Sequence, residues 1–200
     1  MRCSDEIRLR DDEKIILKFI KKTASGRFFF VYLCPVITEA QELKTIEEQI
    51  QLVGSQAELE RQLARLYSFF NKKFPGTELW PFLTEEEAKH ECWLKQIIPK
   101  ISEGSIILFV NDITIKAIEE TIEDIISTCE NAESKGISLI GAIKTAEKFE
   151  MHMLDKDFFK FLDSDAPVYS RILDKLYEDT KRHKELLIAA KLKAGLGQPI

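Results

Sequence analysis

The sequence lacks the cysteine pairs that mark thiolate metal sites. Its four cysteines are scattered, and no two of them form a C-x-x-C pair; they are Cys3, Cys34, Cys92 and Cys129. Isolated cysteines argue against a zinc or iron site built from thiolates and are typical of reduced thiols in the cytosol. A metal site in this chain is therefore expected to use carboxylates and histidines.

Long apolar runs and an excess of basic residues are also missing. No stretch approaches the roughly 20 consecutive apolar residues of a membrane-spanning helix. Residues 1–14 lack the apolar core of a signal peptide. The net charge of −5 and the pI near 5.4 argue against general binding to nucleic acid or to an anionic membrane. We expect a cytoplasmic protein that binds neither.

The composition that remains is typical of a globular protein. Of the 200 residues, 44% are hydrophobic and 32% are charged, which is enough apolar material for a sizeable core. The length indicates one domain with an extension. We expect an N-terminal extension of unknown role over residues 1–53 and a helical domain over residues 54–194.

The extension carries mixed signals. Residues 11–23 have apolar side chains at helical spacing and predict a short helix. A capping-box pattern at Thr38 predicts the start of another helix, which either ends at Gly54 or continues past it. Residues 27–34 are rich in aromatic and β-branched side chains and predict a strand. A strand needs partners, for which residues 7–10 and 105–110 are candidates. The alternative is that these apolar runs are loop or helix segments packed on the helical domain.

Beyond the extension, apolar residues recur every three or four positions, the spacing of helices that are buried on one side. A second capping-box pattern, Ser55 with Glu58, precedes the first of these helices. Two antiparallel helix pairs joined by a long helical crossover make a four-helix bundle, so the predicted fold is mainly all-α. The predicted helices are residues 59–74, 78–100, 115–132 (the crossover), 138–161 and 168–194.

One helix carries a carboxylate and an imidazole on its apolar side. Glu87 and His90 form an E-x-x-H pair, and residues three apart share one face of a helix. Trp80, Leu83 and Leu94 lie on the same face. An ionised carboxylate in such surroundings is costly unless it is paired or bound to a cation. The pair therefore indicates a metal site.

Each of the other bundle helices offers one more metal-competent group on an apolar face, namely Glu60, Glu150 and His183. Each of these residues alone is more typical of a charge at the edge of the core. Four helices that each supply such a group favour a shared site. His152 follows Glu150 by two positions and is expected at the surface, whereas Tyr67 is expected in the core.

Two stretches carry the spacing of a known family. Residues 60–67, followed by Phe74, Trp80 and the E-x-x-H pair, form the first, and residues 138–150 with 176–183 form the second. Over about residues 54–190 they resemble the rubrerythrin-like branch of the ferritin-like superfamily. The resemblance implies a homodimer whose bundles hold two carboxylate-bridged irons that handle oxygen, peroxide or ferrous iron. The ligands that it implies are Glu60, Glu87, His90, Glu150 and His183.

The chain departs from this family at two points. The family's second E-x-x-H needs a glutamate where this chain has Thr180, and a threonine cannot bridge two divalent ions. Glu147, one turn before Glu150, is a candidate substitute. The rubredoxin module, with its paired C-x-x-C motifs, is also missing. We therefore expect a di-iron site or a partly occupied one.

Three functions are compatible with these patterns. The first is a metal-binding oxidoreductase that oxidises ferrous iron or reduces oxygen or peroxide. Carboxylate and imidazole ligands favour iron, with manganese or zinc as alternatives. The second is a non-catalytic binding or structural protein on the same fold, with a degenerate metal site. The third is a zinc hydrolase built on Glu87 and His90, which is less favoured because the H-E-x-x-H pattern of such enzymes is absent.

Overall fold

The computed structural model describes most of the chain, namely residues 18–22, 28–32, 45–110, 115–156, 158, 162–164 and 167–198. The chain divides into two units, residues 1–43 and residues 44–200. The described part of the second unit is mainly helical, which confirms the predicted fold class at that level. Its helices are α1 (Ile46–Lys73), α2 (Leu79–Ser102), α3 (Ile115–Lys135), α4 (Leu139–Asp155) and α5 (Pro167–Gly195).

The first unit contains an antiparallel pair of strands, β1 (Lys18–Lys22) and β2 (Phe28–Tyr32). The strand predicted over residues 27–34 is therefore present. The helix predicted over residues 11–23 is wrong for its last part, because Lys18–Lys22 is extended. The partner of β2 is this neighbouring segment, which had been assigned to the helix. The candidate partner at residues 7–10 and the capping pattern at Thr38 lie outside the described residues.

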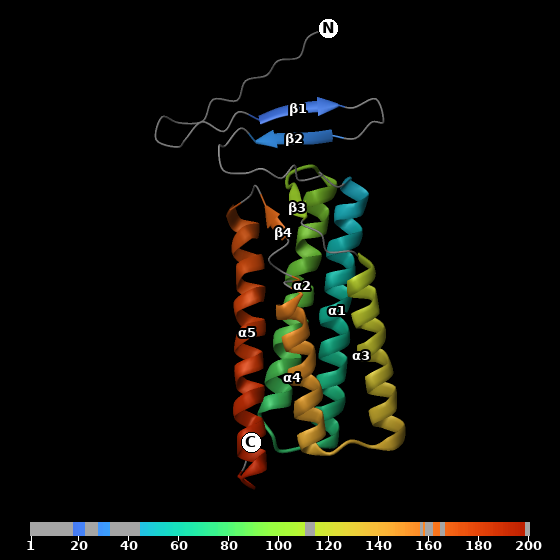
Figure 1. Ribbon diagram of the computed structural model, residues 1–200, viewed down its shortest axis with the longest axis vertical. Coiled ribbons are helices and arrows are strands. Elements are labelled where there is room, and N and C mark those ends of the chain that lie inside the picture. Colours follow the sequence, from blue (N-terminus) through green and yellow to red (C-terminus); the bar gives the residue numbers. More distant parts are fainter. Residues whose placement is uncertain are drawn as a thin grey trace. The chain divides into compact units, whose positions relative to one another are not determined.

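Consecutive helices of the second unit run antiparallel (Figure 1). α1 packs along α2, α4 packs along α5, and α3 packs on α1. Because α3 carries the chain back along the bundle, α2 and α4 point in the same direction. This arrangement is the predicted pair of helical hairpins joined by a helical crossover.

α1 is one continuous helix across Gly54, where the sequence patterns left two possibilities open. Thr45 is its N-cap: the Thr45 side chain accepts a hydrogen bond from the Glu48 backbone N–H at 3.2 Å, and the Glu48 carboxylate accepts one from the Thr45 N–H at 2.8 Å. The helix then runs through Gly54 and Ser55 without a break. Of the two possibilities at Gly54, continuation of the helix is confirmed and a new start at Ser55 is wrong. A glycine only weakens a helix, whereas the capping box at Thr45 satisfies unpaired N–H groups at the start of α1.

α4 ends at Asp155, before the predicted end near residue 161. The following segment contributes a short strand, β4 (Leu162–Ser164), which pairs antiparallel with β3 (Leu108–Val110). Part of the apolar run at residues 105–110 is therefore a strand, as predicted, but its partner lies in the other half of the bundle. This pairing joins the two segments that follow α2 and α4.

Two buried glutamines of α1 fasten these connecting segments. Gln49 Oε1 accepts a hydrogen bond from the Leu108 N–H at 2.8 Å, and Gln56 Nε2 donates to the carbonyl of Phe158. A buried backbone group without a partner costs free energy comparable to a lost hydrogen bond. Gln49 therefore holds the segment that follows α2 against α1, and Gln56 holds the segment that follows α4 against α1.

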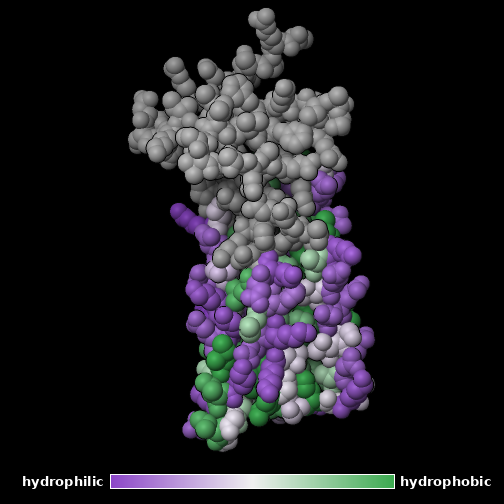
Figure 2. All heavy atoms as spheres, viewed as in Figure 1, coloured by the Kyte–Doolittle hydropathy of each residue, from purple (hydrophilic) through white to green (hydrophobic). Residues whose placement is uncertain are grey.

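The helices bury their apolar faces against one another and keep charged side chains outside. The core includes Leu63, Trp80, Ile143 and Leu176, all with no exposed surface. Figure 2 shows a largely hydrophilic face over the helices, with apolar side chains gathered towards the end of α5, where Leu192 is exposed. None of the described helices is long and apolar enough to cross a membrane.

Candidate metal centre

Five side chains from four helices meet in the interior of the bundle. We name them the carboxylate–histidine cluster: Glu60 of α1, Glu87 and His90 of α2, Glu150 of α4 and His183 of α5. None of the five is more than 1% exposed. The cluster forms because each residue lies on the buried face of its helix, alongside apolar residues of the core. All five are the ligand candidates that the helical spacing predicted.

Glu87 stands at the centre of the cluster. Its Oε2 lies 2.8 Å from Nδ1 of His90, and its Oε1 lies 2.9 Å from Nδ1 of His183. One carboxylate thus faces two imidazoles with two different oxygens. The histidine rings stack, with centroids 5.5 Å apart and planes inclined by 21°. A carboxylate so placed can bridge two cations, because each of its oxygens has its own histidine neighbour.

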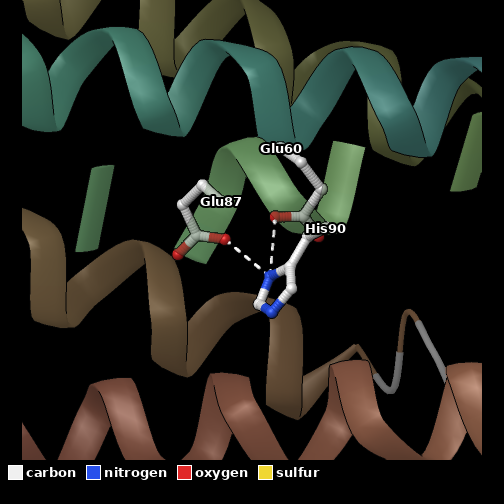
Figure 3. Close-up of side chains that lie close together, drawn as sticks. All are labelled: Glu60, Glu87 and His90. Carbon is white, nitrogen blue, oxygen red and sulfur yellow. Dashed lines mark hydrogen bonds and ion pairs between the residues drawn. The ribbon is translucent and has the colours of Figure 1, made fainter. Parts of the chain in front are cut away.

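The two remaining carboxylates lie on the outer sides of the histidines. Glu60 Oε2 is 3.7 Å from Nδ1 of His90, and Glu150 Oε1 is 3.7 Å from Nδ1 of His183. Figure 3 shows Glu60 and Glu87 both directed at the same ring nitrogen of His90. The two ends of the cluster are therefore alike: each has one histidine, one outer glutamate and one oxygen of Glu87.

These atoms divide into two groups that could each hold a metal ion. The first is Glu60, Glu87 and His90, and the second is Glu87, Glu150 and His183; within each group the ligand atoms lie within 4.8 Å of one another. Glu87 belongs to both. Di-metal sites in helix bundles are built from four glutamates and two histidines. The two groups contain three glutamates and two histidines.

Several buried polar atoms of the cluster have no hydrogen-bond partner among the described residues. They include both oxygens of Glu60, Oε2 of Glu150 and both ring nitrogens of His183. The 2.9 Å contact of His183 with Glu87 is short enough for an ion pair but lacks the alignment of a hydrogen bond. Unpaired buried polar atoms are costly. Cations bound between these atoms would remove that cost, so the residues fit a metal.

Burial and mutual contact set the protonation of the cluster. Burial raises the pKa of Glu60 to about 8, and the neighbouring Glu87 carboxylate adds to the rise. Burial also acts to raise the pKa of Glu87, but its contacts with His183 and His90 outweigh burial and hold that pKa below its usual range. At neutral pH the metal-free cluster therefore contains an ionised Glu87 and a protonated Glu60.

The histidines take up protons in the metal-free state. Burial acts to lower the pKa of His90, but contacts with Glu60 and Glu87 raise it to about 11. The same competition between burial and the carboxylates Glu87 and Glu150 brings the pKa of His183 to about 10. Both rings are then imidazolium ions beside Glu87. Protons occupy the places where a metal would bind, as expected for ligands that must lose protons to bind.

Tyr67 lies beside the cluster and is fully buried. Its hydroxyl donates a hydrogen bond to Oε1 of Glu150 at 2.7 Å. Burial raises the pKa of Tyr67 well above its usual value, and the nearby Glu150 carboxylate adds to this, so the phenol stays protonated. The predicted core position is thus correct, and the hydroxyl in addition fixes the orientation of one outer carboxylate.

Thr180 and Asp179 occupy the region where the family pattern needs a second bridging glutamate. Thr180 is buried, but its hydroxyl donates to the carbonyl of Leu176 at 3.0 Å, within its own helix. Asp179 is also buried, and its Oδ2 lies 3.4 Å from Nε2 of His90. The sequence pattern predicts that Glu178 and Asp179 point one to two residues around the helix from the site, and for Asp179 this expectation is wrong. Its spacing of four from His183 was the available signal, because residues four apart share a helix face.

The other candidates lie apart from the cluster. Glu147 forms an ion pair with Lys191 and is absent from both possible metal groups. His152 was expected at the surface, but it is half-buried, with Nε2 3.2 Å from the hydroxyl of Thr121 on α3. Cys92 is exposed. The groups that meet in the core are therefore carboxylates and imidazoles.

A comparison of the chain with protein-family models, with curated proteins and with solved structures found no match in any of the three.

Proposed function

We propose that this chain is a ferritin-like metal-binding protein, similar to the rubrerythrin-like branch, and that the carboxylate–histidine cluster binds two iron ions. One ion would be held by Glu60, Glu87 and His90. The other would be held by Glu87, Glu150 and His183. The observation that carries the proposal is the position of Glu87, with one carboxylate oxygen facing each histidine.

Charge and ligand chemistry support iron. As metal ligands, the three glutamates would be ionised and would carry three negative charges in a buried site, which two divalent cations would more than neutralise. Mixed oxygen and imidazole ligands suit iron or manganese, and zinc accepts the same donors. When bound, iron would supply the electrons for the reduction of oxygen or peroxide, or would itself be the ion that is oxidised.

The protein's own residues have distinct tasks in this proposal. Glu60, Glu87 and Glu150 would hold the ions through their carboxylates, and Glu87 belongs to both groups. His90 and His183 release their protons as the ions bind. Tyr67 holds Glu150 through its hydroxyl. The apolar walls around the cluster, which include Trp80 and Leu83, exclude water and with it side reactions.

Iron binding tests the proposal. Protein purified without chelators is titrated with ferrous iron in the absence of oxygen, and the bound iron is counted after desalting. We expect about two irons per chain for the wild type and a loss of both in Glu87→Gln. The matched control is Glu85→Gln, which makes the same change at an exposed position of α2. A wild type that retains no iron, or a Glu87→Gln variant that retains as much as the wild type, would overturn the proposal.

A second candidate is a non-catalytic protein on the same fold with a degenerate metal site. Thr180 supports it, because its hydroxyl is bonded within α5, and Glu87 is the one carboxylate shared by both metal groups found among the described residues. The imidazolium rings of His90 and His183 also neutralise Glu87 without a metal. The rate of ferrous iron oxidation in air separates the two candidates. A wild type that binds iron but oxidises it no faster than Glu87→Gln is the degenerate protein.

A further inference from the structure

The two ends of the carboxylate–histidine cluster are alike in their ligands but differ in what surrounds them. At one end, His90 Nε2 faces the Asp179 carboxylate at 3.4 Å. At the other end, His183 Nε2 is buried and has no hydrogen-bond partner among the described residues. Only one of the two imidazoles thus has an acceptor on the nitrogen that points away from Glu87.

Asp179 is held firmly in this position. Its other oxygen, Oδ1, accepts a hydrogen bond from Lys175 at 2.6 Å and lies 3.0 Å from Nη2 of Arg182. Arg182 in turn pairs with Glu86 of α2 at 2.5 Å, which ties α5 to α2 beside the cluster. The carboxylate is therefore fixed by two cations on Oδ1 and leaves Oδ2 directed at His90.

The outer carboxylates, Glu60 and Glu150, also differ in their hydrogen bonds. Both oxygens of Glu60 lack a hydrogen-bond partner among the described residues. Glu150, by contrast, has Oε1 engaged by the hydroxyl of Tyr67. Glu60 can therefore turn either oxygen towards an ion without breaking a hydrogen bond. If Glu150 turns Oε1 towards an ion, it has to break its hydrogen bond with Tyr67.

We infer that the two metal positions are unequal, and that Asp179 is a positioning residue that makes the position of Glu60, Glu87 and His90 the first to fill. This inference rests on the proposed function. A carboxylate on the second nitrogen of a metal-binding histidine fixes the ring orientation and its tautomer, with the proton on Nε2 and the lone pair on Nδ1, and raises its basicity. No described residue supports Nε2 of His183 in this way, so its position fills second and binds more weakly.

The histidines allow the order of filling to be observed directly. The chain has three, His90, His152 and His183, and His152 lies outside both metal groups. In nitrogen-15 NMR of histidine-labelled protein titrated with zinc, Nδ1 of His90 should shift during the first equivalent and Nδ1 of His183 during the second. His152 should not respond to either. Simultaneous shifts of His90 and His183, or an earlier shift of His183, overturn the inference.

Substitution of Asp179 tests whether this residue causes the difference between the two metal positions. Outer partners of metal-binding histidines contribute about 10- to 100-fold to affinity. Asp179→Ala should weaken the affinity for the first zinc ion by that factor and change the affinity for the second ion by less than about threefold. The two ions should then bind with similar affinities, so that the titration no longer shows two separate steps. Asp179→Asn keeps an acceptor oxygen and should restore part of the loss. Glu178→Gln, an exposed neighbour on the same helix, is the matched control and should change neither step.

The outcomes separate this inference from the proposed function. If wild-type protein binds no zinc or iron at the cluster, both are wrong. If it binds two ions with equal affinity, or if Asp179→Ala weakens both steps equally, the metal site stands and the inference fails. If Asp179→Ala does not fold, the Asn variant and the order of the histidine shifts in the wild type still decide the question.

Discussion

Glu87 of α2 and His183 of α5 meet across the bundle, with 2.9 Å between the carboxylate Oε1 and the ring Nδ1. The two residues are far apart in the sequence, and both are almost fully buried. Their contact joins the two halves of the bundle at the centre of the carboxylate–histidine cluster. Without it Glu87 would keep His90 of its own helix as its imidazole partner and would otherwise face the carboxyl groups of Glu60 and Glu150.

Substitution of the glutamates should separate metal-free stability from metal binding. The pKa of about 8 keeps Glu60 protonated at neutral pH. Glu60→Gln replaces a neutral group by a neutral one of similar shape, and should change the free energy of unfolding of metal-free protein by less than about 1 kcal/mol. Glu87→Gln removes the partner of two buried imidazolium ions and should cost about 3–5 kcal/mol. Urea denaturation measures the unfolding free energy of each variant. Equal losses in the two variants would contradict a protonated Glu60 and an ionised Glu87.

The metal-free protein should lose stability as the pH rises. The contribution of His90 and His183 is fully present below the ordinary histidine pKa of about 6.5, and is lost as the pH rises towards their pKa values of about 11 and 10. Glu60 acts in the same direction, because its raised pKa means that the fold favours the protonated carboxyl. Denaturation midpoints measured between about pH 6.5 and pH 10 should fall steadily. A constant or rising midpoint would show that the cluster is not protonated as described.

Tyr67→Phe removes the hydroxyl that donates to Glu150. A hydrogen bond to a buried carboxylate contributes about 1.5–3 kcal/mol, and the loss leaves an oxygen unpaired. We expect metal-free protein to lose about 1.5–3 kcal/mol of unfolding free energy. In the background of Glu150→Gln the same substitution should cost less, and this double-mutant cycle isolates the contact. Equal costs in both backgrounds would mean that the hydroxyl is not coupled to Glu150.

Thr180→Glu should have opposite effects with and without metal. The new carboxylate would replace a buried side chain that is bonded within α5, so the metal-free protein should unfold at a lower temperature. Ions that bind the native state stabilise it, and a fourth carboxylate should tighten their binding. Thr180→Gln, of equal size and without charge, is the control and should show only the destabilisation. If added ferrous iron raises the unfolding temperature of Thr180→Glu no more than that of Thr180→Gln, residue 180 lies outside the metal site.

The start of α1 can be tested with two substitutions. Thr45→Ala removes the side chain that caps the helix and should cost about 0.5–2 kcal/mol. Ser55→Ala lies within the helix, where alanine is the better helix former, and should be neutral or slightly stabilising. Thermal unfolding of the two variants measures the difference. A larger loss for Ser55→Ala would favour a helix that begins at that residue.

Helical periodicity was enough to predict which groups meet in the core. Glu60, Glu150 and His183 each lie at a fixed spacing from apolar residues of their own helix, and local spacing decides which side of a helix is buried. Asp179 has the same kind of spacing relative to His183. The family pattern drew attention to position 180 instead, and the neighbouring carboxylate that the fold brings to His90 was passed over.

The parts that could not be predicted depend on pairing across long distances in the sequence. β3 pairs with β4 through backbone hydrogen bonds between segments that no local pattern connects. Lys18–Lys22 has apolar residues that suit a strand or a helix equally, and only its partner β2 decides between them. At Gly54 the local pattern allowed either an end or a continuation of the helix, and α1, which packs along α2, is continuous there.

Crystals of the protein soaked with ferrous iron without oxygen, and measured at the iron absorption edge, test the central claim most directly. The account predicts two anomalous peaks, one between Glu60, Glu87 and His90 and one between Glu87, Glu150 and His183. The first peak should appear at the lower iron concentration. Peaks confined to surface carboxylates, with none beside Glu87, would contradict the account.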